Sequence, residues 1–286
     1  MKKILAVSGG VDSMVMLDLA VRKFPAEELV VATFDHGTRE SSREDAEFVA
    51  RIAYALQLKF YRGEARLGMK ISEEKAREKR YEFLRKVAFL EKGEIWTAHH
   101  LDDLVETVAI NCLRGTGWRG LAVLSAPGVR RPLIEGVFGE VFDKRGILRY
   151  AAEREISFRQ DPTNASEQYL RNRVRERSRG VSAETKREVY ELWVRQVEIK
   201  REVEAILEAV LPEDLRFRRE WFEGVGEREA MEILRAGLVR AGVSATWPQI
   251  REFYRAILNY ESGKKFNLPG GRLVELKRRD FQLKVW

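Results

Sequence analysis

The fold is decided by the sequence Lys3-Ile-Leu-Ala-Val7-Ser8-Gly9-Gly10-Val11-Asp12-Ser13. Its first half is a short apolar run that predicts a buried parallel strand, and the apolar spacing from Met14 to Val21 predicts a helix. A glycine-rich turn between a strand and a helix presents backbone N–H groups at the helix N-terminus, where anions bind. We therefore predict that residues 8–13 form an anion-binding loop.

The side chains of this loop indicate that the anion is a phosphate. Gly9 and Gly10 allow phosphate oxygens to approach the main chain, and Ser8 and Ser13 add hydroxyl donors. Asp12 would repel a phosphate, so we expect it to bind Mg²⁺ carried by that phosphate. The loop lacks the Gly-Lys-Ser/Thr end of a Walker A motif and the third glycine of a dinucleotide-binding motif. A serine-rich turn without function is the alternative, which its place after the first strand disfavours.

Length and composition are those of a globular protein. With 286 residues, 44% of them hydrophobic, the chain can bury a full core, and one large plus one small domain is the natural division. No apolar run approaches the roughly 20 residues that span a membrane, and the N-terminus reads as a strand rather than a signal peptide. The single cysteine, Cys112, excludes an internal disulfide and is expected to be buried. We therefore expect a cytoplasmic protein without a membrane partner.

The net charge favours a polyanionic partner. Lys and Arg total 52 against 45 Asp and Glu, which gives a formal charge of +7. The densest basic group consists of Arg171, Arg173, Arg175, Arg177 and Arg179. Smaller groups occur at 216–219 and 277–279. A solvated helix face is the alternative for any one group, but three groups along one chain favour contact with a nucleic acid.

Strand and helix patterns alternate through the first half of the chain. Strands are predicted at 3–7, 29–34, 58–61 and 94–98. Helices are predicted between them at 13–21, 41–56 and 72–90. This alternation predicts an α/β, Rossmann-like domain, because right-handed βαβ units build a parallel sheet. Ligands bind at the carboxyl ends of such strands, and these ends are followed by the loops 8–13, 35–39 and 99–106.

The second half is predicted to be mainly helical, with a small β region at its end. Helices are predicted at 102–113, 139–155, 183–211, 227–241 and 248–259. Strands are predicted at 265–268, 272–276 and 281–285. The helix at 183–211 is long, charged and amphipathic, which suits a spacer between domains. We predict a first domain over 1–182, a helical linker over 183–212 and a small α+β C-terminal domain over 213–286.

A second group of polar residues follows the fourth predicted strand and includes His99 and His100. Asp103 and Glu106 are three residues apart, so on a helix they share one face. Two such carboxylates could share Mg²⁺ or hold the amine of an amino-acid substrate. The alternative is the acidity common at helix N-termini, which explains Asp102 better than Glu106. Zinc is disfavoured because no cysteine or third spaced histidine accompanies this group.

Three further segments carry candidate residues. Asp35 and His36 follow the second strand, where an α/β sheet holds the base or ribose of a nucleotide; an Asx-type turn is the alternative. Arg114 opens a glycine-rich stretch and could neutralise pyrophosphate or a phosphate of RNA. Asp161-Pro-Thr-Asn164 precedes the dense arginine group and alternatively caps the helix that follows.

Taken in order, these blocks resemble the tRNA(Ile)-lysidine synthetase family of N-type ATP pyrophosphatases, whose phosphate loop is the PP-loop. The resemblance rests on seven blocks, at 8–13, 35–45, 74–84, 98–107, 114–121, 131–133 and 161–175. The segment 263–271 also resembles the start of the C-terminal β region of the family. One such block is weak support, whereas seven in order are strong.

The resemblance implies a two-step reaction that uses ATP and Mg²⁺. The C2 carbonyl oxygen of the wobble cytidine, in an isoleucine tRNA with a CAU anticodon, attacks the α-phosphate of ATP. Free L-lysine then attacks C2 through its ε-amine and expels AMP, which leaves lysidine. The oligomeric state stays open, with a dimer as one reading. The rival readings are a PP-loop tRNA thiolase and a non-catalytic protein that binds nucleotide or tRNA.

The resemblance also implies roles for particular residues. Nucleotide binding falls to Ser8, Gly9, Gly10, Val11, Asp12, Ser13, Asp35 and His36. Catalysis falls to Asp12, His100, Asp103, Glu106, Arg114 and Arg171. The tRNA is expected to meet the arginines at 171–179 and the domain at 213–286, and the catalytic domain is expected to be 1–182. Whether Asp103 and Glu106 bind lysine or metal stays open.

Overall fold

The computed structural model describes residues 1–35, 41–64, 73–159, 174 and 180–284. It divides into two compact units, Met1–Val197 and Glu198–Trp286, and the division falls inside the long helix α7 (Ala183–Val210). The expected roles of His36 and of the arginines at 171–179 concern residues outside the described ranges. The boundaries predicted around a separate linker stay a prediction.

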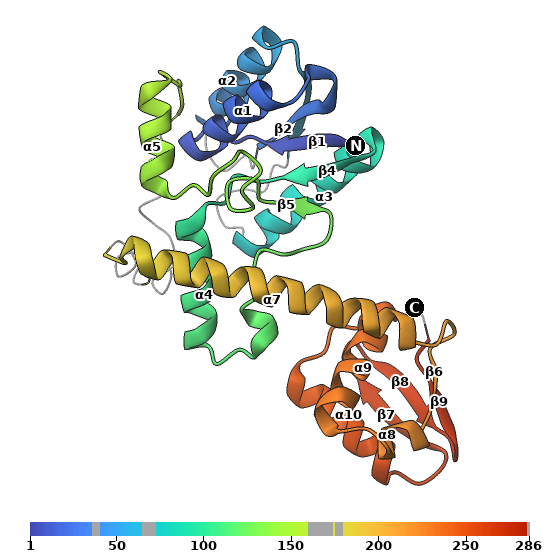
Figure 1. The fold of residues 1–286 in the computed structure, drawn as a ribbon. Coiled ribbons are helices and arrows are strands. Elements are labelled where there is room, and N and C mark those ends of the chain that lie inside the picture. Colours follow the sequence, from blue (N-terminus) through green and yellow to red (C-terminus); the bar gives the residue numbers. More distant parts are fainter. Residues whose placement is uncertain (36–40, 65–72, 160–173, 175–179, 285–286) are drawn as a thin grey trace. The chain divides into compact units, whose positions relative to one another are not determined.

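The first unit is built on a parallel sheet (Figure 1). Its five strands lie in the order β3-β2-β1-β4-β5. Their bounds are Lys2–Ala6, Leu29–Asp35, Lys59–Glu64, Gly93–Trp96 and Val129–Arg130, numbered from β1 to β5. The four strands predicted from the sequence are confirmed. The fifth was missed because it is only two residues long and lacks an apolar run.

Helices cover both faces of this sheet, which is why its strands read as continuous apolar runs. On one face, Leu5 and Val31 pack with buried residues of α1 (Val11–Lys23), α2 (Ser41–Ala55) and α5 (Lys144–Glu153). On the other face, strand residues pack against α3 (Glu73–Glu91). The alternation of side chains along a strand divides its apolar residues between these two layers. The predicted α/β fold class is confirmed.

The strand order reverses between β1 and β4, so the carboxyl ends of these central strands form the switch point where α/β sheets bind ligands. The loop after β1 leads into α1. The loop after β4 leads into α4 (Leu101–Leu113). The register pairs Leu5 of β1 with Trp96 of β4, so the two loops leave the sheet side by side. The fold therefore brings together the two polar groups singled out in the sequence.

One predicted helix is shorter than expected, because α5 begins at Lys144 rather than at Gly139. Gly139 has a φ of 95°, a left-handed conformation that ends rather than begins a helix. Asp143 is the N-cap, and its Oδ1 accepts a hydrogen bond from the Gly146 N–H at 2.8 Å. The start of α5 is thus fixed by a local cap, which places Lys144 in its first turn.

The second unit contains two antiparallel strand pairs and three helices beside its part of α7. The strands are β6 (Arg216–Arg218) with β9 (Asp280–Gln282), and β7 (Lys264–Leu268) with β8 (Arg272–Leu276). The helices are α8 (Glu220–Glu223), α9 (Glu227–Arg240) and α10 (Trp247–Asn259). Its core contains several buried phenylalanines, and Phe217 is stacked on Phe281 at 5.4 Å between ring centroids. The small α+β unit was predicted, whereas β6 was missed.

One arginine of the predicted basic groups has a structural role in this unit. The Arg219 guanidinium donates to the carbonyl oxygens of Ile257 and Tyr260, each at 2.7 Å, and of Lys277 at 3.1 Å. Its planar donors tie α10 to the strand region. Within the described ranges, no helix is both long and apolar enough to cross a membrane.

Candidate active site

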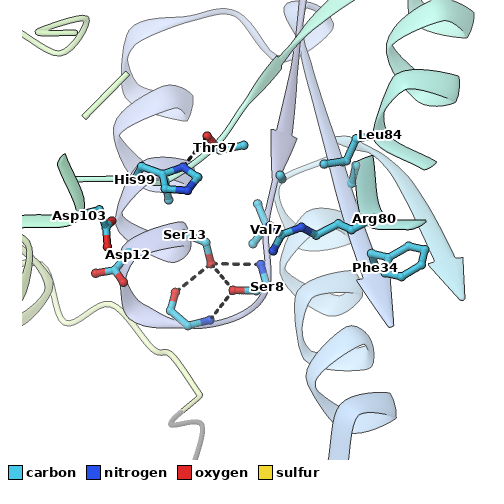
Figure 2. A pocket seen from close by; sticks show the side chains of 14 residues that line it. Val7, Ser8, Asp12, Ser13, Phe34, Arg80, Leu84, Thr97, His99 and Asp103 are labelled. Atoms are coloured by element: carbon cyan, nitrogen blue, oxygen red, sulfur yellow. Dashed lines mark hydrogen bonds between the residues drawn. The ribbon is translucent and has the colours of Figure 1, made fainter. Parts of the chain in front are cut away.

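A cavity of about 320 Å³ opens at the switch point of the sheet (Figure 2). Residues from β1, α1, β2, α3, α4 and the loops after β1 and β4 surround it. The lining consists of Ala6, Val7, Ser8, Gly10, Asp12, Ser13, Ala32, Phe34, Arg80, Leu84, Thr97, Ala98, His99 and Asp103. The predicted phosphate loop and the predicted His-Asp group therefore share one cavity.

The loop after β1 is held by a closed set of hydrogen bonds, drawn in Figure 2. Ser13 Oγ donates to the Gly10 carbonyl at 2.9 Å and accepts from the Ser8 N–H at 3.2 Å. Ser8 Oγ accepts from the Gly10 N–H at 3.4 Å. Gly9 has a φ of 87°, which an L side chain rarely adopts. The serines thus preshape the turn, and the N–H groups of the first turn of α1 have no intrahelical acceptor.

At one end of the cavity, the two lining carboxylates Asp12 and Asp103 flank the buried imidazole of His100, which itself does not line the cavity. His100 is 4% exposed, and its Nε2 lies 4.0 Å from Asp12 Oδ1 and 3.6 Å from Asp103 Oδ2. The backbone N–H of His100 donates to Asp103 Oδ2 at 3.0 Å. Asp12 comes from α1 and Asp103 from α4, so the adjoining ends of β1 and β4 bring the two acids together. Figure 2 shows both carboxylates on this side of the cavity.

His99 is a neutral imidazole in the lining. Its Nδ1 lies 2.9 Å from Thr97 Oγ1. Loss of hydration lowers the pKa of His99 to about 4, and the nearby Asp103 carboxylate only partly opposes this effect. Near neutral pH the ring therefore adds a hydrogen-bonding group but no charge.

The opposite side of the cavity combines an apolar surface with one cation. Phe34 and Leu84 present apolar groups there, and the Arg80 guanidinium extends between them and the loop (Figure 2). A base or another planar apolar group suits such a surface, and an arginine suits a phosphate or carboxylate. The cavity thus has an acidic end and an apolar, basic end.

Several residues predicted for the site do not line this cavity. Asp35 is buried and forms an ion pair with Arg62 at 3.0 Å. Glu106 is buried on α4, and Arg114 is exposed where that helix ends. Cys112 is exposed, so the expectation of a buried thiol is wrong: α4 turns this position toward solvent.

Two lysines near the site were missed. Lys144 Nζ donates to Asp12 Oδ1 at 2.6 Å, and Lys186 Nζ lies 2.7 Å from Asp102 Oδ1. No sequence signal points to the first contact, because it joins residues 132 positions apart. The second could not be foreseen because Lys186 begins a long charged helix that reads as solvated.

The residues present fit a magnesium ion carried by a phosphate. Among the described residues no three His, Cys, Asp or Glu side chains converge as a metal cage. Mg²⁺ is usually held by one or two carboxylates together with substrate phosphates and water, rather than by such a cage. Asp12 and Asp103 supply carboxylates of this kind beside the loop.

A family model described as a PP-loop domain matches residues 1–179. The chain belongs to the PP-loop family. This membership confirms the predicted loop and implies the use of ATP. Relatives include a tRNA(Ile)-lysidine synthase of Enterococcus faecalis, 36% identical over 180 residues, which are 60% of this chain and 38% of that protein. Another tRNA(Ile)-lysidine synthase, from Thermotoga maritima, is 38% identical over 186 residues, which are 61% of this chain and 43% of that protein.

This PP-loop chain thus spans about two fifths of the length of those two relatives. A solved structure has a similar fold: the U34-tRNA thiolase NcsA from Methanococcus maripaludis with its 4Fe-4S cluster. The TM-score is 0.56 at 18% identity, and the match covers 69% of this chain and 73% of that chain. At this identity the likeness concerns the fold alone.

Proposed function

We propose that the protein is a tRNA(Ile)-lysidine synthetase, a ligase that joins L-lysine to the wobble cytidine of a CAU-anticodon isoleucine tRNA. The observation that carries the proposal is the shared cavity, which is lined by the PP-loop, including its carboxylate Asp12, and by Asp103 of α4. The relatives named tRNA(Ile)-lysidine synthase support the same activity.

In the first step, the N–H groups of the loop and the first turn of α1 bind the phosphates of ATP. The C2 carbonyl oxygen of the cytidine forms a bond to the α-phosphorus, and the bond between the α- and β-phosphates breaks. Pyrophosphate leaves, and its charge is stabilised by the loop N–H groups and the hydroxyls of Ser8 and Ser13. Mg²⁺, held by Asp12 with the phosphates, would supply charge neutralisation there.

In the second step, the ε-amine of lysine forms a bond to C2, and AMP leaves with the oxygen. The amine enters as an ammonium and must lose protons, so a carboxylate base is required. Asp103 lines the cavity and is our candidate to hold the amine. Glu106, one helical turn along α4 and buried, is the second candidate. Arg80 and Arg114 are candidates for contacts with the AMP or tRNA phosphate.

The tRNA is expected to contact the second unit as well as the arginines at 171–179. A cavity of about 360 Å³ lies among the strands of that unit. Its charged lining consists of Arg216, Lys265, Lys277, Lys284, Glu275 and Asp280. An excess of cations on strands suits the phosphate backbone, which supplies most of the affinity in RNA and DNA binding. We propose that residues 213–286 act as a tRNA-binding domain.

The thiolase reading is less well supported. The solved thiolase named above carries a 4Fe-4S cluster, and such clusters are held by several cysteine thiolates. These 286 residues contain one cysteine. A non-catalytic binding protein would not need the paired carboxylates of the cavity.

Nucleoside mass spectrometry tests the proposal. The protein is incubated with CAU-anticodon isoleucine tRNA, ATP, Mg²⁺ and lysine, and the tRNA is then digested. We expect a cytidine heavier by one lysine less one water, which disappears in Asp12→Ala. An unchanged tRNA would refute the lysidine assignment, and sulfur in the base would favour the thiolase.

A further inference from the structure

Lys144 makes a contact with the PP-loop carboxylate that neither the sequence nor the proposed function explains. Its ammonium donates to Asp12 Oδ1 at 2.6 Å. Asp12 lines the cavity beside the loop that is expected to bind phosphate. The side chains of Lys144 and Asp12 are 35% and 33% exposed, so the pair is accessible to solvent rather than buried in the core.

The backbone of Lys144 is held by Asp102, whereas its ammonium contacts Asp12. Its N–H donates to Asp102 Oδ2 at 2.7 Å. The other oxygen of Asp102 is 2.7 Å from Lys186 Nζ, which also lies 3.0 Å from Asp143 Oδ2. Burial opposes the charge of Lys186, but hydrogen bonds to Asp102 and Asp143 outweigh it and raise the pKa of this lysine, so it stays charged. Lys186 thus neutralises the negative charge of Asp102, and Lys144 neutralises that of Asp12.

A purely structural role for the Lys144–Asp12 pair is weak. Helix α5 is already attached to α1 by the Tyr150 hydroxyl, which donates to Asp18 at 2.8 Å. Ile147 and Ala151 are buried in the core they share with α1. A partly exposed ion pair adds little to this attachment, because water screens the attraction between the two charges.

We propose that Lys144 is a ligand of the pyrophosphate moiety of ATP, and that its ammonium competes with the divalent cation for Asp12. The inference rests on the proposed use of this cavity for ATP. A bare carboxylate beside the loop would repel phosphates, and the ammonium cancels that repulsion. The ammonium has three N–H donors, and Asp12 accepts from one of them. When the divalent cation binds Asp12, the ammonium leaves that carboxylate and donates to the phosphates instead.

The competition makes opposite predictions for the two partners of the ion pair. Without a divalent cation, pyrophosphate depends on the ammonium, so Lys144→Met should weaken pyrophosphate binding at least tenfold. Asp12→Asn removes the competing carboxylate, so it should leave this affinity unchanged or raise it several-fold. With Mg²⁺ present, the wild type should bind more tightly, and Asp12→Asn should lose most of that gain.

Titration calorimetry with pyrophosphate, in EDTA and in Mg²⁺, measures these affinities. The matched control is Lys86→Met, which removes an exposed lysine paired with Glu82 on α3. Circular dichroism checks folding, and Lys144→Arg, which keeps the charge, should retain most of the affinity in EDTA. Wild-type affinity in Lys144→Met would overturn the proposal. An equal loss in Lys144→Met and Asp12→Asn would also overturn it, because the pair would then merely hold the loop.

The outcome is separate from that of the proposed function, because pyrophosphate binding needs neither tRNA nor lysine. Lysidine formation with unaltered pyrophosphate binding in Lys144→Met would refute the role of Lys144 alone. The expected binding changes without lysidine formation would refute the substrate assignment alone.

Discussion

The two units each carry a polar cavity of similar size, about 320 Å³ beside the PP-loop and about 360 Å³ among the strands of the second unit. At and next to the first, charged groups form ion pairs: Lys144 with Asp12, which lines the cavity, and Lys186 with Asp102. In the second, the lysines at 265, 277 and 284 and Arg216 make no side-chain ion pair with the residues that the structure describes.

This difference separates a site arranged for chemistry from a surface arranged for binding. Charges fixed by hydrogen bonds cost little to reorganise during a reaction, which is how enzymes stabilise developing charge. Cations without protein partners remain available for phosphates, whose recognition tolerates variable geometry. Substitutions in one cavity should therefore leave the role of the other unchanged.

The largest effect is expected at the acidic end of the first cavity. Asp12→Asn should lower tRNA-dependent cleavage of ATP by about 100-fold or more, as expected for loss of a group that organises transition-state charge. The measurement is the rate of AMP formation at saturating tRNA. Asp18→Asn, on the same helix but outside the cavity, is the control and should keep most of the rate. Equal losses in the two variants would mean that α1 is merely destabilised.

A smaller effect is expected from the second cavity, and it should fall on binding rather than on chemistry. Lys265→Gln combined with Lys277→Gln should weaken tRNA binding about tenfold, and should lower the slope of log K against log salt by about one for each phosphate that the variant no longer neutralises. Filter binding at several salt concentrations measures both quantities. AMP formation at saturating tRNA should stay near the wild-type rate. A lowered rate of AMP formation with unchanged tRNA affinity would contradict the assignment of this cavity to binding.

The turn of the PP-loop should respond more mildly. Gly9→Ala forces an L side chain into a φ of 87°, although the added Cβ meets its nearest neighbour, Val49, only at 3.5 Å. We expect a loss of roughly 1 kcal/mol in unfolding free energy and a several-fold weaker affinity for ATP. Gly117→Ala, where no such φ is needed and no atom lies within 4 Å, is the control. Thermal melts and nucleotide titration would show whether the loop is preshaped as described.

The weakest effect on function is expected at His99, whose ring instead contributes to the pH dependence of stability. Its pKa is lowered from 6.5 to about 4, so the unfolded chain binds the proton more tightly than the folded one. Stability is therefore full above pH 6.5 and is lost as the pH falls from 6.5 to 4, by at most about 3 kcal/mol from this group. Urea unfolding at several pH values, compared with His99→Gln, measures this contribution. An identical pH dependence in the variant would contradict it.

Much of the first unit could be predicted from the sequence, because its signals are local. The apolar run before Ser8 and the glycines after it predict a strand, a turn and a helix without long-range information. Asp103 follows a buried strand, and the topology of a parallel sheet is enough to bring it to the same edge as Asp12. The same reasoning predicted that Asp35 lies in the site. Asp35 does not line the cavity, and its carboxylate is paired with Arg62 of the neighbouring strand β3.

What the sequence could not predict depends on partners distant along the chain. Lys144 reaches Asp12 only after α5 has packed on α1, and its position also depends on the Asp143 cap. Arg219 looked like part of a basic surface, yet three carbonyl groups use its donors. Cys112 read as buried because its neighbours are apolar, whereas exposure depends on which face of α4 is covered.

The central claim is that the PP-loop cavity transfers AMP from ATP to the tRNA before lysine takes part. Exchange of labelled pyrophosphate into ATP, measured in the absence of lysine, tests it most directly. We predict exchange that requires both Mg²⁺ and the CAU-anticodon isoleucine tRNA, and that is lost in Asp12→Asn. Absence of exchange with the intact tRNA, or release of ADP and phosphate instead of AMP and pyrophosphate, would contradict adenylation of the tRNA as the first step.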